Sequence, residues 1–140
     1  EVEDMGAHEM NSSDDYPDFI NPLAQKISEN PKDYMGIILG GSGQGEAMCA
    51  NRFKNVRAAL FYGSHLAQAP IDVLGTSSTD PFEMLRLTRE HNNSNMLSLG
   101  VRFLTEDQAM QAVETFLNGT FSGDERHVRR IEKIAKIESK

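Results

Sequence analysis

The sequence has one cysteine, few basic residues and no long apolar run, and each shortage excludes something. One cysteine among 140 residues cannot form an internal disulfide, and it is typical of a protein from a reducing compartment, so we expect a cytoplasmic location. Lysine and arginine number 14 against 21 acidic residues, and the net charge of −7 argues against binding to nucleic acid or to anionic membranes. No apolar run is long enough to span a bilayer.

Short apolar segments alternate with amphipathic ones, which predicts a single α/β domain over residues 1–140 with a parallel sheet. We expect strands at residues 34–39, 56–62 and 95–99, after the end of a strand at residues 1–5. We expect helices at residues 17–29, 46–53 and 80–91, from Thr105 to about residue 122, and at 124–138. Residues 63–80 show little periodicity and are predicted to form an insertion loop.

Three details refine these helices. Thr105 and Gln108 form a capping box, which predicts where a helix begins. Pro22 fits the helix at residues 17–29 only if it lies in the first turn. Cys49 is expected to be a core residue rather than a reactive thiol.

Residues 36–46, GIILGGSGQGE, join an apolar strand to a helix through closely spaced glycines. Glycine allows a tight turn and close approach to a ligand, and the amides of Gly43, Gln44 and Gly45 would face an anion above the helix. Glu46 beside such a loop suits proton abstraction next to a carbonyl. The run does not match a P-loop, a dinucleotide fingerprint or a nucleophile elbow, and a plain strand-to-helix turn remains the alternative.

Ligands of parallel α/β sheets bind at the carboxyl ends of the strands. Residues 40–46, 62–65 and 100–102 are expected to meet there. His91 comes just before a strand, so it would have to bend back over such a site, and the alternative is a histidine that stabilises a helix terminus.

Arginines near the carboxyl terminus form a second candidate group. Arg126 and Arg130 are one helical turn apart, and together with Arg102 they would suit a phosphate. The alternative is a solvated helix face that pairs with neighbouring acidic residues. His8 and His127 lack metal-ligand spacing and are expected at the surface or in supporting positions; His65 has no assigned role, and no metal site is predicted.

Six collinear stretches resemble the ribose-5-phosphate isomerase B family, which includes galactose-6-phosphate isomerase subunits. The stretches are residues 14–17 (DDYP), 36–53 (GIILGGSGQGEAMCANRF), 56–60 (VRAAL), 89–93 (REHNN), 99–102 (LGVR) and 126–130 (RHVRR). The resemblance implies a three-layer Rossmann-like fold with a five-stranded parallel sheet of order 2-1-3-4-5. It also implies a place in carbohydrate metabolism, in the pentose phosphate pathway.

The resemblance implies isomerisation of an aldose phosphate, most simply ribose 5-phosphate to ribulose 5-phosphate, through a cis-enediolate and without metal or cofactor. Glu46 matches the catalytic base and His91 the residue that opens the sugar ring. Ser42 would bind sugar oxygens, and Asn92 with the loop amides would stabilise the enediolate. The substrate-binding set implied is Gly41, Gly43, Gln44, Gly45, Asn92, Arg102, Arg126 and Arg130, with Ser42 among the catalytic residues. Members form homodimers, or tetramers, whose sites are shared between subunits.

Two departures from the family pattern stand out. The family begins with a strand and helix that carry an Asp-His pair, and nothing in this sequence matches them, so we expect the domain to be incomplete at its N-terminus. The insertion at residues 63–80 is longer than the usual link and is a hypothetical lid or interface element. The alternatives to ribose-5-phosphate isomerisation are a non-catalytic sugar-phosphate-binding subunit of the same fold and an isomerase for allose or galactose 6-phosphate.

Overall fold

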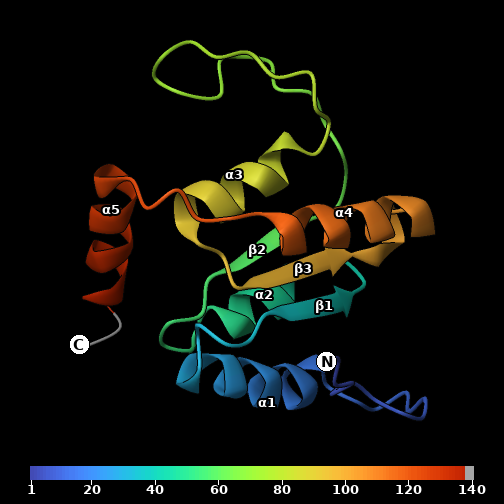
Figure 1. The fold of residues 1–140 in the computed structure, drawn as a ribbon. Helices are drawn as coiled ribbons and strands as arrows, with labels where there is room; N and C mark the ends of the chain where they lie inside the picture. The colour runs from blue at the N-terminus through green and yellow to red at the C-terminus, as the bar shows by residue number, and fades with distance from the viewer. Residues whose placement is uncertain (138–140) are drawn as a thin grey trace.

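The computed structural model describes residues 1–137, in which helices cover both faces of a three-stranded parallel sheet (Figure 1). The elements are α1 (Tyr16–Glu29), β1 (Gly36–Gly40), α2 (Gln44–Ala50), β2 (Ala58–Phe61), α3 (Glu83–Asn92), β3 (Met96–Gly100), the 3-10 helix η1 (Val101–Phe103), α4 (Glu106–Asn118) and α5 (Glu125–Ala135). Helices α1 and α2 lie on one face and α3 and α4 on the other, which confirms the predicted three-layer α/β architecture. No helix within residues 1–137 is long and apolar enough to cross a membrane.

Strand β3 lies in the middle of the sheet, between β1 and β2. Gly36 pairs with Met96 and Gly40 with Gly100, and β2 pairs along the other edge of β3. All five residues of β3 are buried, and a strand with a neighbour on each side and helices on both faces is the position that buries such a run. The implied order 2-1-3-4-5 would place these strands side by side in the order in which they follow along the chain. That part of the prediction is wrong, because β3 lies between β1 and β2.

The number of strands also differs from the expectation. The family's sheet has five strands, of which four were expected in this chain; residues 1–137 contain three, because residues 1–5 form no strand. The short segment at residues 1–5 is mostly exposed, with Val2 96% exposed, and forms no part of the sheet.

Two clusters of buried apolar side chains hold the three layers together. The cluster under α1 and α2 consists of Ile20, Ala24, Ile27, Ile38, Ala50, Val56 and Met96. The cluster under α3 and α4 consists of Phe61, Phe82, Leu85, Leu97, Leu99, Ala112 and Phe116. Met96 of β3 belongs to the first cluster, whereas Leu97 and Leu99 belong to the second, in keeping with the two-residue period of a strand. Cys49 is partly buried and packs against the edge of the first cluster, and burial raises the pKa of its thiol, so it borders the core that it was predicted to join.

All five predicted helices are present, but α2 ends at Ala50 rather than residue 53 and α4 at Asn118 rather than about residue 122. The expected end of the last helix, at residue 138, lies outside the described residues. The Thr105 hydroxyl accepts the amide of Gln108, whose side chain accepts the amide of Thr105, so α4 begins with the predicted capping box. Pro22 lies inside α1, beyond its first turn, which contradicts the expectation. Pro22 has no amide hydrogen to donate to the carbonyl of Asp18, four residues earlier. The helix tolerates this loss because both residues are exposed, so that water can bind the Asp18 carbonyl instead.

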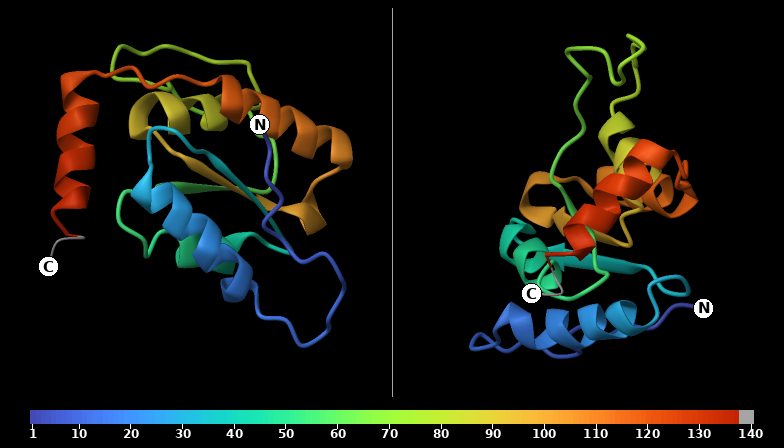
Figure 2. Two further views of the ribbon diagram at one scale, coloured as in Figure 1. Left: turned by 60° about the horizontal axis from the view of Figure 1, so that its bottom comes forward. Right: turned by 90° about the vertical axis from the view of Figure 1, so that its left-hand side faces the viewer.

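Residues 62–82 form a long loop that projects from the body between β2 and α3 (Figure 2). Its two ends are tied together, because the amide of His65 donates to the carbonyl of Pro81 at 3.0 Å. Near its tip, the Asp72 carboxylate accepts the Thr76 hydroxyl at 2.6 Å, a contact that lowers the pKa of Asp72. The projecting segment thus carries its own local hydrogen bonds.

Candidate active site

The glycine-rich loop joins the carboxyl end of β1 to α2 and is fastened to the middle strand. Gly43 is the N-cap residue of α2 and adopts a left-handed conformation with φ of 71°. Its carbonyl accepts the fully buried hydroxyl of Ser98 on β3 at 2.7 Å. A Cβ atom at Gly43 would lie 3.0 Å from the backbone of Leu99, so both the conformation and the packing require glycine here. The loop is therefore held in one shape.

Glu46 lies in the first turn of α2, and its carboxyl group folds back over the end of β1. A Cβ atom at Gly40 would overlap this carboxyl group and would lie 2.8 Å from its Oε2 atom. The absence of a side chain at Gly40 therefore creates the space that Glu46 occupies. Beside it, the Ser42 hydroxyl accepts the amide of Gln44 at 3.3 Å.

Arg102 reaches the same loop from the carboxyl end of β3. Its amide donates to the carbonyl of Gly41 at 3.2 Å, and its guanidinium carbon would lie 3.0 Å from a Cβ atom at Gly41. Tyr62 follows β2 and would contact a Cβ atom at Gly100 at 2.9 Å. The three segments that were expected to meet at the carboxyl ends of the strands do meet there.

Tyr16 is a residue of this site that the sequence analysis did not single out. Its hydroxyl oxygen would lie 2.7 Å from a Cβ atom at Gly45, so the first residue of α1 lies directly beside the loop. The available signal was its place in the stretch at residues 14–17, which served only as a match to the family. Ser98, which holds the loop from below, had no signal beyond being a polar residue in an apolar strand.

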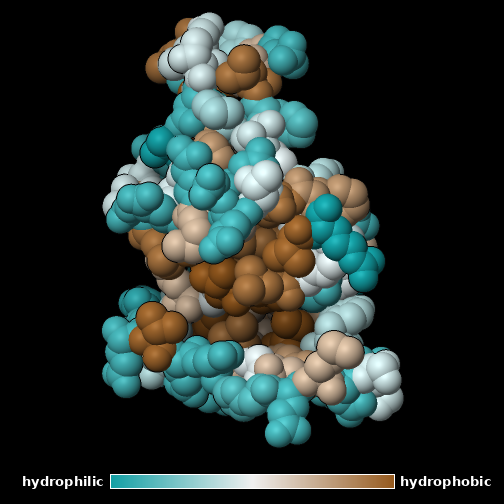
Figure 3. All heavy atoms as spheres, turned by 90° about the vertical axis from the view of Figure 1, so that its right-hand side faces the viewer, coloured by the Kyte–Doolittle hydropathy of each residue, from teal (hydrophilic) through white to brown (hydrophobic). Residues whose placement is uncertain are grey.

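The face around the carboxyl ends of the strands is partly apolar. Figure 3 views the molecule from this side and shows apolar side chains gathered between the two helical layers. Exposed apolar residues on the neighbouring elements include Leu39 of β1 at 69%, Phe103 of η1 at 64% and Met110 of α4 at 65%. A surface of this kind is typical of an interaction site.

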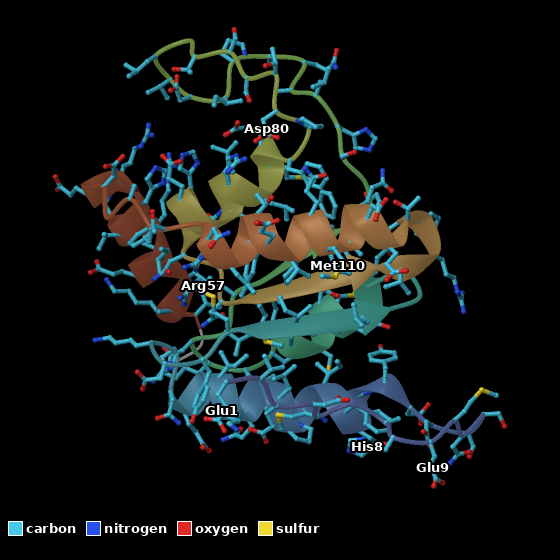
Figure 4. All side chains as sticks on the ribbon, turned by 45° about the vertical axis from the view of Figure 1, so that its right-hand side comes forward. Glu1, His8, Glu9, Arg57, Asp80 and Met110 are labelled. Atoms are coloured by element: carbon cyan, nitrogen blue, oxygen red, sulfur yellow. The ribbon has the colours of Figure 1, made fainter. Side chains whose placement is uncertain are left out.

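The remaining predicted residues lie at the opposite end of the sheet. His91 and Asn92 end α3 just before β3 begins, and the carbonyl of Asn92 accepts Nε of Arg57 at 3.0 Å. Arg57 precedes β2 and lies at the end of the sheet that is nearer to α5 (Figure 4). Since all three strands are parallel, about 16 Å of β3 separates this end from the glycine loop. One chain therefore does not bring His91 and Asn92 to Glu46.

Helix α5 stands beside this second group (Figure 1) and carries Arg126 and Arg130. His127 on α5 stacks on His91, with ring centroids 4.2 Å apart. Nε of Arg126 donates to Nε2 of His127 at 3.1 Å. The His127 side chain is 3% exposed, so of the two expected positions, surface or supporting, it occupies a buried supporting one.

A cleft of about 450 Å³ lies between α3 and the loop at residues 62–82. The loop lines it with His65, Leu66, Ala67 and Ile71, and α3 with Glu83, Met84, Leu87, Thr88, His91 and Asn92. The base of the loop is fixed to α3, because Asp80 (Figure 4) pairs with Arg86 at 2.5 Å. Within residues 1–137 no group of three or more side chains is arranged to hold a metal ion.

The family model described as Ribose/Galactose Isomerase matches residues 1–73 and 77–134 of this chain. A protein of Mycoplasma genitalium called probable ribose-5-phosphate isomerase B is 36% identical over 137 residues, which are 98% of this chain and 78% of that protein. The M. genitalium ribose-5-phosphate isomerase B structure with bound ribulose 5-phosphate matches with a TM-score of 0.80 and 34% identity, over 97% of this chain and 77% of that one. The Clostridium thermocellum ribose-5-phosphate isomerase B structure matches with a TM-score of 0.79 and 36% identity, over 99% and 80%.

Proposed function

The chain belongs to the ribose/galactose isomerase family, and from that membership we propose that it is a ribose-5-phosphate isomerase, which interconverts ribose 5-phosphate and ribulose 5-phosphate. Relatives that match nearly the whole chain include a probable ribose-5-phosphate isomerase B of Mycoplasma genitalium and the ribose-5-phosphate isomerase B of Mycolicibacterium paratuberculosis. A structure of the M. genitalium enzyme holds bound ribulose 5-phosphate. The observation that carries the proposal is the Glu46 carboxyl group, which lies against Gly40 within a rigid loop of backbone amides.

Glu46 acts as the base in this proposal. Its carboxylate takes the proton from C2 of the open-chain aldose, and the electron pair of that bond forms the C1–C2 double bond while O1 becomes negative. The same carboxyl group returns the proton to C1, the hydroxyl proton of O2 moves to O1, and C2 becomes the carbonyl carbon. Atoms and charge balance without a metal or a redox cofactor.

The glycine loop and Arg102 bind the substrate in this proposal. The amides that follow Gly41 stabilise the negative enediolate oxygen, and each such donor is worth about 2.7–4 kcal/mol in comparable anion holes. Ser42 hydrogen-bonds sugar oxygens beside Glu46. Arg102, whose guanidinium lies over Gly41, binds the phosphate.

A second copy of the chain completes the site. His91, Asn92, Arg126 and Arg130 lie at the amino ends of the strands, and a homodimer, or a tetramer built from it, can bring them to Glu46 of the partner. The apolar side chains around the carboxyl ends of the strands supply a surface for this contact. We further propose a cytoplasmic location, which the single cysteine supports.

Subunit complementation tests the shared site. E46Q and H91A copies, co-expressed with different tags and purified as mixed dimers, should have one site with both changes and one with neither. We expect each parent to convert ribose 5-phosphate at most at about a hundredth of the wild-type rate, and the mixed dimer to recover about half of wild-type turnover. A mixed dimer as inactive as its parents would contradict the shared site.

A six-carbon phosphosugar is the second candidate substrate. One observation favours it: the loop at residues 62–82 adds a cleft of about 450 Å³ beside His91 and Asn92. Turnover of ribose 5-phosphate, allose 6-phosphate and galactose 6-phosphate, followed by NMR, separates the candidates. We expect kcat/KM to be highest for ribose 5-phosphate. A higher kcat/KM for either hexose phosphate would make that sugar the substrate in place of ribose 5-phosphate. Binding without any conversion would identify a non-catalytic sugar-phosphate-binding subunit.

A further inference from the structure

Two imidazole rings stack where α3 ends and α5 begins. The ring centroids of His91 and His127 lie 4.2 Å apart, and the ring planes differ by 12°. Both side chains belong to helices, so their backbones are fixed. Two flat rings in parallel contact restrict each other's rotation, because either ring would have to displace the other in order to turn.

His127 is the more firmly held of the two rings. Its side chain is 3% exposed, whereas that of His91 is 22% exposed. Nε2 of His127 accepts a hydrogen bond from Nε of Arg126 at 3.1 Å, so the proton of the neutral ring belongs on Nδ1. Its amide donates to the carbonyl of Asp124 at 2.8 Å. His127 is the buried residue that fixes α5 to α3.

The charge on His127 is controlled by its surroundings. Burial lowers the pKa of His127, and the positive charges of neighbouring groups lower it further, opposed by the carboxylate of Asp124, which lies 3.9 Å from Nε2. The charged and titratable groups that face His127 are His91 on α3 and Asp124, Arg126 and Arg130 at α5, and Glu90 lies beside His91. A neutral His127 places no positive charge against the ring of His91 in the stack.

We propose that His127 is a positioning residue, which holds the imidazole of His91 in the orientation that opens the sugar ring. The inference rests on the proposed function, because it takes His91 as the residue that acts on the ring. His127 acts through His91 and does not contact the sugar. His127 also links His91 to Arg126, because it stacks on His91 and accepts a hydrogen bond from Nε of Arg126. The terminal nitrogens of Arg126 are left to bind the phosphate.

Ring opening is chemically separable from isomerisation. The C1–O4 bond of the furanose breaks, its electron pair goes to O4, O4 takes a proton from His91, and the C1 hydroxyl releases its proton to water as C1 becomes an aldehyde. Ribulose 5-phosphate is an open chain, because the hydroxyl that would close a five-membered ring carries the phosphate. Exchange of its C1 hydrogen with solvent therefore needs Glu46 and no ring opening.

The experiment compares these two reactions in the full-length wild-type protein and in variants. One assay follows conversion of ribose 5-phosphate, and the other follows deuterium entry at C1 of ribulose 5-phosphate in D2O. We expect H127A to lower kcat for conversion by about 10²-fold, the effect of a reacting group misplaced by 1 Å, while C1 exchange stays within about twofold. H127F keeps a flat ring against His91 and should recover most of the conversion.

Three comparisons make the result decisive. H91A should show the same split between conversion and exchange, and the double variant should lose little more than H91A alone, because both residues serve one step. H8A, a change at an exposed histidine before α1, should affect neither assay. H127L replaces H127A if the smaller side chain prevents folding.

Each contrary outcome has its own meaning. Equal losses of conversion and exchange in H127A would overturn the proposal and make His127 a purely structural residue. Unchanged conversion in H127A would overturn it as well. Wild-type protein that neither converts ribose 5-phosphate nor exchanges C1 of ribulose 5-phosphate would instead refute the proposed function.

Discussion

Gly40→Ala tests whether the space left by a missing side chain positions the base. A methyl group at residue 40 would lie 2.8 Å from Oε2 of Glu46, where ordinary contacts begin at 3.4 Å, and it would overlap the other carboxyl atoms more severely. The carboxyl group must therefore retreat by about 1 Å, and a displacement of that size costs about 10²-fold in rate. This corresponds to about 2.7 kcal/mol of activation free energy.

Steady-state kinetics with ribose 5-phosphate is the assay. We expect kcat to fall about 10²-fold in G40A while KM changes by less than about threefold, because the phosphate contacts are untouched. The shorter side chain of E46D should avoid the methyl group, so G40A should cost far less in that background. G6A, at an exposed glycine before α1, is the matched control. A kcat of G40A equal to wild type, with normal thermal stability, would refute the placement of Glu46 against Gly40.

The remaining predictions concern substrate affinity, stability and pH. Arg102→Gln should raise KM for ribose 5-phosphate at least about tenfold, since a hydrogen bond to a charged group is worth about 1.5–3 kcal/mol; an unchanged KM would remove Arg102 from the phosphate site. Thr105→Ala should lower the free energy of unfolding by about 1 kcal/mol in urea titrations, because α4 loses its capping box, and no change would argue against that cap. The lowered pKa of His127 predicts full stability above the ordinary histidine pKa of about 6.5 and a loss as pH falls below it, because the unfolded chain then binds the proton first. Urea midpoints between pH 7.5 and 5 should fall less steeply for H127F than for wild type, and equal slopes would contradict this.

The elements that depend on local sequence were predictable. The glycine loop, the capping box at Thr105 and the alternation of strands and helices follow from residue types at fixed spacing, and the structure confirms them. The segments that meet at the carboxyl ends of the strands followed from the parallel arrangement alone.

Features that depend on contacts between distant segments were not predictable. The middle position of β3 depends on where α3 crosses the sheet, which no local pattern encodes. The contact between Tyr16 and Gly45 and the burial of His127 depend on how α1 and α5 pack. The sequence indicated only that His91 would have to bend back in order to reach the site. In the structure, His91 and Glu46 lie at opposite ends of the sheet.

Hydrogen exchange at C2 of ribose 5-phosphate tests the central claim, that Glu46 transfers a proton between neighbouring carbons. The protein is incubated with ribose 5-phosphate in D2O, and NMR follows both ribulose 5-phosphate formation and deuterium at carbon. We expect conversion with deuterium entry in the wild type, and the loss of both in E46Q with ligand affinity within about threefold, because the carboxylate acts in the transition state. Conversion that continues in E46Q would show that Glu46 is not the base.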